Sequence, residues 1–331
     1  MRKALLIVFS IPALAQVLVN GAGATFPYPI YAKWFDEFHR LHPSALINYQ
    51  SVGSGAGIRQ LKAGVLDLGA SDMPLNDSDP ALSAKGLLHF PTVIGGVVPI
   101  YNLPNLNREL NFTPQVLAGI MLGKITRWDD PQLIEANRGA KLPATEIFVV
   151  HRSDGSGTTY ILSEYLSRVS EEWKTKVGMG TSIRWKVGIG AKGNEGVAGL
   201  VKQTPFSFGY AELVYALQNR IACGRVRNNS GRFIKADLAS IRAAAVAFAS
   251  SMPDDFRISI IDAPGKDAYP IASYTWLLTP ARIPDPVKKR IIVDFLHWMV
   301  LDGQRMAADL GYAPLPASVA SKVWKACDRI Q

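Results

Sequence analysis

The feature that most constrains the fold of this chain is a pattern that occurs three times. A short apolar strand runs into a glycine-containing turn, and the turn leads directly into a helix. Two of these turns are Gly53-Ser54-Gly55 and Gly155-Ser156-Gly157, and the third is Gly21-Ala22-Gly23-Ala24-Thr25-Phe26. Because glycine and proline also separate short apolar runs from helical patterns elsewhere, the sequence predicts an α/β protein.

Hydrophobic periodicity places the elements around these turns. Ile30, Trp34, Phe35, Phe38 and Leu41 recur at helical spacing, which predicts a helix over 28–41 with one buried face. We expect strands over 46–49 and 146–150, and helices from about 56, from the second Gly-Ser-Gly turn through 173, and over 286–310.

Length and composition favour a folded protein with two lobes. The chain has 331 residues, of which 48% are hydrophobic and 19% are charged. The 36 Lys and Arg residues exceed the 27 Asp and Glu residues, which gives a net charge of +9. Such a surplus fits nucleic acid, an anionic membrane surface, a small anionic ligand or a merely solvated surface. The absence of a long Lys/Arg block in the sequence gives no support to a nucleic-acid partner.

The first fifteen residues have the pattern of a secretory signal peptide, which predicts export to the periplasm. Arg2 and Lys3 precede an apolar run that continues through Pro12 to the small-residue site Ala13-Leu14-Ala15. This run is shorter than the ~18 apolar residues of a spanning helix. Cleavage after Ala15 would remove two positive charges, so that +9 − 2 = +7 remains.

Two cysteines, Cys223 and Cys327, are present in the whole sequence. In an oxidising compartment they could form one disulfide, or both could be free and buried. A metal site built from cysteines is excluded.

The three turns suggest a site for an oxyanion. The first N–H groups of a helix have no intrahelical acceptor, and the helix dipole favours negative charge there. Glycine lets the backbone approach a ligand closely, and Ser or Thr can donate a hydroxyl. Each turn alone is a weak signal, but together they could direct several amides at one anion.

Two charged positions sharpen this hypothesis. Arg152 precedes the second Gly-Ser-Gly turn, where its planar guanidinium could bind an oxyanion and Asp154 could hold it in place, although a surface ion pair is the alternative. Asp72 follows the run 67–71. An ionised carboxylate only accepts hydrogen bonds, so beside an anion it selects one that still carries a proton. Phosphate keeps a proton near neutral pH and sulfate does not, unless Asp72 is simply a turn residue.

Enzyme motifs are missing. Neither Gly-Ser-Gly turn continues into Gly-Lys-Ser/Thr, and neither Ser54 nor Ser156 lies in Gly-x-Ser-x-Gly. His39 and His42 share a helix face and could bind a metal, and His151 could be a base, but exposed polar roles fit these residues better. The sequence therefore predicts no catalytic residue and no metal site.

At these residues the sequence resembles the phosphate-binding component of Pst-type ABC phosphate importers. The motifs that carry the resemblance occur in order over nearly the whole chain after the signal peptide. They are Gly21–Pro27, Tyr31–Trp34, Gly53–Gly55, Asp67–Asp72, Gly123–Pro131, Arg152–Thr158, Gly193–Gly196, Gly209–Glu212 and Tyr269–Ile271. A local departure is Gly55-Ala56-Gly57, which varies a small-residue stretch.

The resemblance implies a two-lobed periplasmic binding-protein fold of type II. Lobe I would contain residues 16–95 and 270–331 and lobe II residues 96–269, with crossings near Gly95-Gly96 and Tyr269. It also implies that phosphate lies between the lobes, with Asp72 accepting its proton and Asp154 orienting Arg152. The phosphate-binding residues implied are Thr25, Phe26, Ser54, Asp72, Arg152, Ser156, Gly157 and Thr158.

The resemblance further implies a monomer without a cofactor that hands inorganic phosphate to an inner-membrane ABC permease. Three hypotheses stay open from the residues. The first is phosphate capture by lobe closure, and the second is capture of sulfate, molybdate or a phosphate ester. The third is a phosphatase that uses Ser54 or Ser156.

Overall fold

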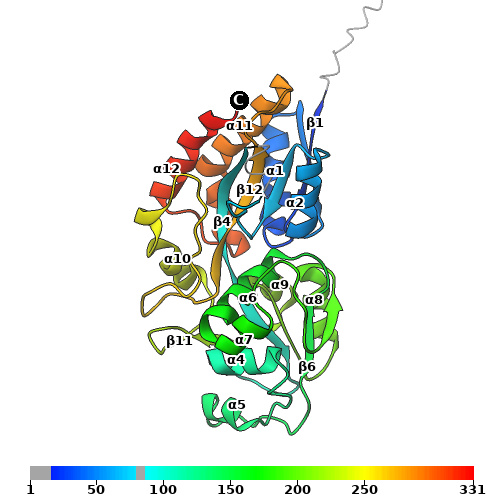
Figure 1. Cartoon of the computed structure of the whole chain (residues 1–331), viewed down its shortest axis with the longest axis vertical. Helices are drawn as coiled ribbons and strands as arrows, with labels where there is room; N and C mark the ends of the chain where they lie inside the picture. Colours follow the sequence, from blue (N-terminus) through cyan, green and yellow to red (C-terminus); the bar gives the residue numbers. More distant parts are fainter. Residues whose placement is uncertain (1–15, 80–85) are drawn as a thin grey trace, which may run out of the picture.

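The computed structural model describes residues 16–79 and 86–331, so the predicted signal peptide lies outside the described residues. Figure 1 shows an elongated molecule in which two groups of elements are stacked along the long axis. We call the group around β1, β2 and β3 lobe I and the group around β6, β7 and β8 lobe II. The α/β class predicted from the sequence is confirmed, because helices and strands alternate along both lobes.

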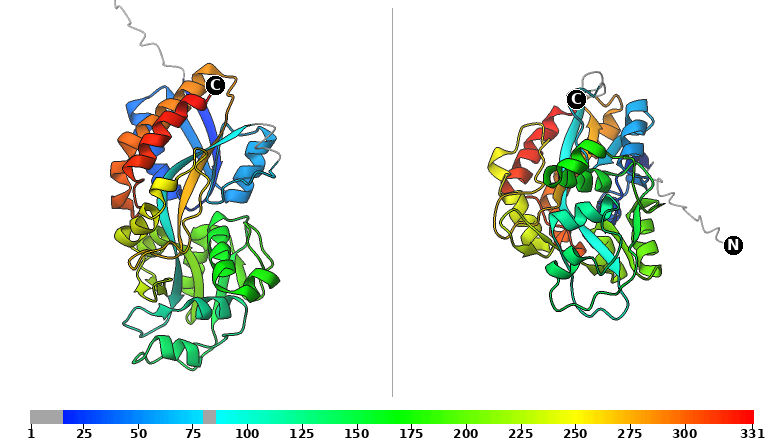
Figure 2. Two further views of the ribbon diagram at one scale, coloured as in Figure 1. Left: turned by 60° about the vertical axis from the view of Figure 1, so that its left-hand side comes forward. Right: turned by 60° about the horizontal axis from the view of Figure 1, so that its bottom comes forward.

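Lobe I contains the first half of the main sheet, in the order β2-β1-β3-β12-β4. Its strands are β1 (Val17–Gly23), β2 (Ala45–Ser51), β3 (Leu68–Ser71), β12 (Ala272–Pro280) and the first part of β4 (Leu87–Asn102). Its helices are α1 (Tyr28–Leu41), α2 (Ser54–Ala63), α11 (Pro286–Leu301) and α12 (Ala317–Ala326). Figure 2 shows α11 and α12 side by side on one face of this lobe.

Lobe II continues the same sheet in the order β4-β8-β6-β7. Its strands are the rest of β4, β6 (Phe148–Arg152), β7 (Ile189–Ala191), β8 (Ser207–Glu212) and the short β9 (Ala222–Cys223). Its helices are α4 (Pro114–Met121), α5 (Pro131–Ala136), α6 (Gly157–Val169), α7 (Glu171–Lys176), α8 (Gly193–Gln203) and α9 (Leu213–Asn219), while α10 (Leu238–Val246) packs against β4 and β12. A small second sheet consists of β5 (Asn111–Phe112), β10 (Arg225–Arg227) and β11 (Phe233–Ile234).

The long strand β4 belongs to both lobes. Residues 87–96 pair with β12, and residues 97–102 pair with β8. The change of partner falls at Gly96, where the first crossing was predicted, and β12 begins at Ala272, close to the predicted return. The residue bounds of the lobes stay a prediction, since residues 252–256 contact lobe I: Lys322 donates to the Met252 carbonyl and Trp276 to that of Phe256.

Local structure differs from the sequence prediction at three places. The predicted helix through 173 is two helices, because the Ser170 hydroxyl accepts the N–H of Trp173 and starts α7. The predicted helix over 286–310 ends at Leu301, where Gly303 lets the chain approach closely enough for its carbonyl to accept from the Trp34 indole. The predicted strand at 146–150 runs from Phe148 to Arg152 instead.

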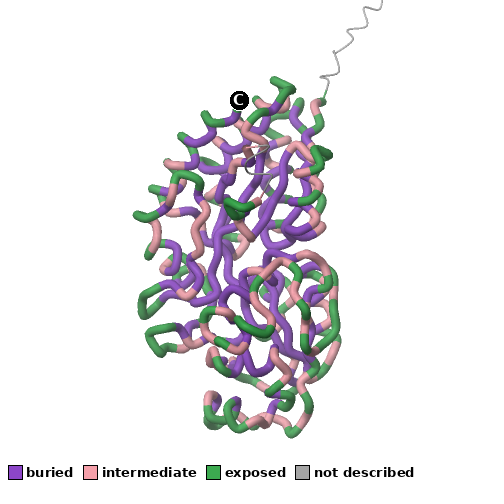
Figure 3. Tube along the Cα trace, viewed as in Figure 1, coloured by how far each residue is buried: buried purple, intermediate pink, exposed green. Residues whose placement is uncertain are grey.

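The core follows the sheet, as Figure 3 shows. The helix predicted over 28–41 is α1, and it buries Ile30, Trp34, Phe35 and Phe38 as the periodicity indicated. The prediction was wrong for Leu41, which is exposed because it is the last residue of the helix. Strand β12 is buried along almost its whole length, between β3 and the first part of β4. Among the described residues, none of the helices is both long and apolar enough to cross a membrane.

Candidate functional site

The lobe I side of the candidate site is formed where three parallel strands end. Gly23 of β1 pairs with Ser51 of β2 and with Ala70 of β3, so the carboxyl ends of these strands lie next to each other. Loops at the carboxyl ends of parallel strands are where α/β proteins place their ligands. The register therefore brings together three predicted residues that lie far apart in sequence, namely Thr25, Ser54 and Asp72.

The lobe II side repeats this arrangement. Arg152, the last residue of β6, pairs with Ala191, the last residue of β7. The loop after β6 provides Asp154 and Ser156, and α6, with Ser156 as its N-cap, begins with Gly157 and Thr158. The loop after β7 leads into α8, whose second residue is Asn194.

The two sides are in contact. The N–H of Gly55 donates to the carbonyl of Gly155 over 2.9 Å. Gly157 lies against lobe I so closely that a Cβ atom there would be 2.3 Å from Asp72 Oδ2 and 2.4 Å from Ser54 Oγ. Every predicted binding residue is buried. The structure thus gathers the predicted set at one place between the lobes.

Arg152 is held in a fixed orientation. Its Nε donates to Asp154 Oδ1 over 2.7 Å and its Nη2 to Asp154 Oδ2 over 2.5 Å, while Nη1 lies 3.4 Å from Thr158 Oγ1. Burial alone would raise the pKa of Asp154, but the hydrogen bonds and charge of Arg152 outweigh it and keep that pKa low. A buried guanidinium oriented by a bidentate carboxylate suits a planar, two-bond contact with an oxyanion.

Asp72 has one satisfied and one unsatisfied oxygen. Thr275 Oγ1 donates to Oδ1 over 2.7 Å, whereas the buried Oδ2 has no hydrogen-bond partner within residues 16–79 and 86–331. Burial raises the pKa of Asp72 to about 7, and Thr275, Arg152 and Ser54 only partly oppose this rise. The carboxyl group is therefore poised to share a proton with whatever lies against Oδ2.

Five backbone N–H groups of the predicted set find no acceptor in the described part of the chain. They belong to Thr25, Phe26, Ser54, Gly157 and Thr158, and all five residues are buried. A buried N–H without a partner is costly, so a group of them at one place indicates a ligand rich in acceptor atoms. Ser156 differs, because its N–H donates to the Thr181 carbonyl and its Oγ accepts from the N–H of Thr159. Only its hydroxyl proton is left to donate to a ligand.

Sequence reasoning missed two residues of the site. Thr275 lies on β12 and reaches Asp72 across 203 positions of sequence, so no local pattern could indicate it. Asn194 is completely buried and contacts Thr25 and Thr158. The signal available for Asn194 was its place in the Gly193–Gly196 motif, directly after a short strand.

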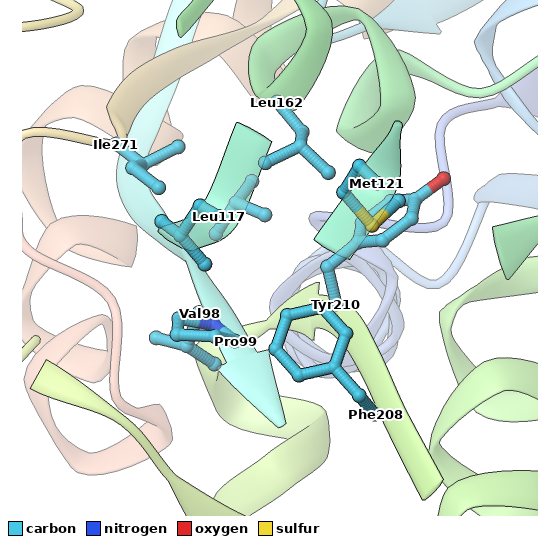
Figure 4. A pocket seen from close by; sticks show the side chains of 9 residues that line it. Val98, Pro99, Leu117, Met121, Leu162, Phe208, Tyr210 and Ile271 are labelled. Atoms are coloured by element: carbon cyan, nitrogen blue, oxygen red, sulfur yellow. The ribbon is translucent and has the colours of Figure 1, made fainter. Parts of the chain in front are cut away.

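The small apolar cavity, the two cysteines and His39 show no arrangement suited to an anion. The cavity of Figure 4 is lined mainly by apolar side chains of β4, α4, α6 and β8, together with Ile271, and is only about the size of one water molecule. Cys223 and Cys327 are both free cysteines. Within residues 16–79 and 86–331 no cluster of three or more His, Cys, Asp or Glu residues could hold a metal. His39 instead bonds to the Ala45 carbonyl.

The high pKa of Asp72 predicts a pH dependence of stability for the ligand-free protein. From the ordinary value of 3.8 up to about 7, the native state binds more protons than the unfolded state. The free energy of unfolding therefore falls as the pH rises through this window. Denaturant unfolding at pH 5 and pH 8 measures the loss of unfolding free energy between these two pH values. This loss should be smaller in Asp72→Asn than in the parent by roughly 2 kcal/mol. An equal loss in both proteins would contradict the assignment.

Comparisons with known proteins agree with this geometry. The family model of the PBP superfamily domain matches residues 10–302. A phosphate-binding protein PstS of Xylella fastidiosa is 45% identical over 93% of this chain and 84% of its own length. The phosphate-binding protein PstS of Pasteurella multocida is 41% identical over 96% of this chain and 92% of its own.

Solved structures show the same fold. The phosphate binding protein of Stenotrophomonas maltophilia superimposes with a TM-score of 0.70 at 18% identity, over 93% of each chain. A high-affinity periplasmic phosphate-binding protein, PfluDING, solved with phosphate, gives 0.72 at 21% identity over 93% of each chain. At such identities the likeness concerns the architecture alone.

Proposed function

Because this chain belongs to the PBP superfamily and, within it, to the family of PstS phosphate-binding proteins, we propose that it captures inorganic phosphate between its lobes. Its fold is the two-lobed, type II binding-protein fold that the sequence predicted. The binding surface is the buried junction described above, and no bond is made or broken there.

One observation carries the proposal: backbone N–H groups that have no acceptor in the described chain lie around a carboxylate oxygen of Asp72 that has no donor there. The five unpaired N–H groups and the Arg152 guanidinium call for an anion with several oxygen atoms. The unpaired Oδ2 of Asp72 calls for an anion that also carries a proton. Near neutral pH, phosphate meets both demands, whereas sulfate meets only the first.

In this proposal each predicted residue has a role. Thr25, Phe26 and Ser54 donate from lobe I and Asp72 accepts the proton of phosphate. Ser156, Gly157 and Thr158 donate from lobe II beside Arg152, which Asp154 orients. The contact between Gly55 and Gly155 is possible only when the lobes are closed, so ligand contacts from both sides favour the closed state.

The transport role follows from the family. Relatives and neighbours are named for phosphate binding, and a solved structure from Vibrio cholerae is named an ABC-type phosphate transport receptor. We propose that this chain is exported to the periplasm by cleavage after Ala15 and acts there as a monomer. The closed form then delivers phosphate to an inner-membrane ABC permease.

Calorimetric titration of purified, ligand-stripped protein tests the binding role. We expect one phosphate per chain, binding of the similarly protonated arsenate, and sulfate binding weaker by a factor of about 1,000 or more. A failure to bind phosphate, or equal binding of sulfate, would overturn the proposal. Hydrolysis of a phosphomonoester above the buffer rate would instead point to the phosphatase alternative.

A further inference from the structure

Asn194 occupies the centre of a small network that joins the two lobes. It is the second residue of α8 and is completely buried. Its Nδ2 donates to Thr25 Oγ1 of lobe I over 2.8 Å and to Thr158 Oγ1 of lobe II over 3.0 Å. One amide group therefore contacts one hydroxyl from each side of the site.

These contacts use the acceptor capacity of both hydroxyls. A hydroxyl oxygen can accept two hydrogen bonds and donate one. Thr25 Oγ1 accepts from Nδ2 and, over 3.4 Å, from the backbone N–H of Asn194. Thr158 Oγ1 accepts from Nδ2 and, over 3.4 Å, from Arg152 Nη1. Only the proton of each hydroxyl remains, and neither proton has an acceptor within residues 16–79 and 86–331.

The orientation of the Asn194 amide is fixed from its other side. The backbone N–H of Glu212 donates to Asn194 Oδ1 over 3.0 Å. Because an N–H can face only an acceptor, the carbonyl oxygen must point to Glu212 and the NH₂ group must point to the two threonines. The network thus has a single direction, from the Glu212 backbone through Asn194 to the hydroxyl groups.

We infer that Asn194 is a positioning residue that turns the hydroxyls of Thr25 and Thr158 into obligate donors toward the bound phosphate. This inference rests on the proposed function. Without Asn194, either hydroxyl could rotate to donate elsewhere and present a lone pair to the anion, which repels it. With Asn194, both present a proton before phosphate arrives, so that less reorganisation opposes binding.

The same residue favours closure of the site. Its bond to Thr25 crosses from lobe II to lobe I, and the Tyr215 hydroxyl donates to the Thr25 carbonyl over 2.5 Å beside it. Loss of Asn194 therefore removes an inter-lobe bond together with the orientation of two ligand-facing groups.

A double-mutant cycle separates positioning from a general structural role. Phosphate affinity is measured by calorimetry for the parent, Asn194→Ala, Thr25→Val/Thr158→Val and the triple variant. In the parent background we expect Asn194→Ala to weaken phosphate about 10-fold or more, because hydrogen bonds to charged groups are strong. In the Thr25→Val/Thr158→Val background, where no hydroxyl remains to be oriented, the same change should cost less than about 2-fold.

The outcomes distinguish the two proposals. If the parent does not bind phosphate, the proposed function fails. If the parent binds phosphate and Asn194→Ala costs equally in both backgrounds, or nothing in the parent, the role of Asn194 is wrong while the function stands.

Should Asn194→Ala fail to fold, the near-isosteric Asn194→Asp replaces it in the same cycle. The carboxylate keeps the acceptor for Glu212 but draws both hydroxyl protons toward itself. In the Thr25→Val/Thr158→Val background, Asn194→Asp weakens phosphate binding through charge repulsion alone. In the parent, the same change should weaken phosphate binding more than this, by a further factor of about 10 or more. Equal losses would overturn the inference.

Discussion

Asp72→Asn should largely abolish discrimination between phosphate and sulfate. Above the pKa of about 7 of Asp72, where the carboxyl group is ionised, sulfate would place an oxygen lone pair against the unpaired, buried Oδ2 of the parent, and two acceptors facing each other repel. The asparagine amide can present an N–H at this position, which suits a fully ionised anion. We expect the ratio of phosphate to sulfate affinity to fall from about 1,000 or more to about 10 or less.

The test is a pair of calorimetric titrations on ligand-stripped Asp72→Asn and on the parent at about pH 8.5, where Asp72 is mostly ionised and phosphate still carries a proton. Asp36→Asn is the matched control, because it removes the same charge from an exposed position on α1. The control should keep the selectivity of the parent, which shows that net charge is not the cause. If Asp72→Asn bound both anions as the parent does, the hypothesis that Asp72 selects phosphate by accepting its proton in a hydrogen bond would be wrong.

Much of the secondary structure was predictable because its signals are local. The period of Ile30, Trp34 and Phe38 located α1, and the glycine turns located the starts of α1, α2 and α6. Helix ends were harder to predict because they depend on competing contacts. Ser170 interrupts a pattern that continues on both sides of it, and the end of α11 depends on the packing of Gly303 against Trp34, 269 positions away.

The residues of the site also differ in how far a local sequence pattern could predict them. Arg152 and Asp154 form an ion pair two residues apart, which a sequence pattern can suggest. Thr275 and Asn194 act only through partners brought close by the sheet register, so their roles become visible once β12 lies beside β3 and β7 beside β6. The small-residue stretch at Gly55-Ala56-Gly57 also gains a reason: a Cβ on Gly57 would lie 2.4 Å from the Cα of Gly23.

Gly157→Ala should prevent the lobes from closing on phosphate and weaken binding at least about 100-fold, because contacts from one lobe are lost. The new methyl group would lie 2.3 Å from Asp72 Oδ2 and 2.4 Å from Ser54 Oγ, both of which belong to the opposite lobe. Backbone strain does not contribute, since Gly157 is not among the residues with positive φ. Each lobe keeps its own core, so the ligand-free variant should unfold at nearly the temperature of the parent.

Gly199→Ala is the matched control, because a Cβ at that position of α8 meets no atom within 4 Å. It makes the same chemical change in a helix interior, where alanine is favoured over glycine by ~1 kcal/mol, and should leave phosphate affinity unchanged. Small-angle scattering supplies a second readout. Phosphate should reduce the radius of gyration of the parent and of Gly199→Ala but not that of Gly157→Ala. Parent-like affinity and compaction in Gly157→Ala would mean that the close approach of Gly157 to Asp72 is not required for capture, since a methyl group there cannot coexist with the closed junction described above.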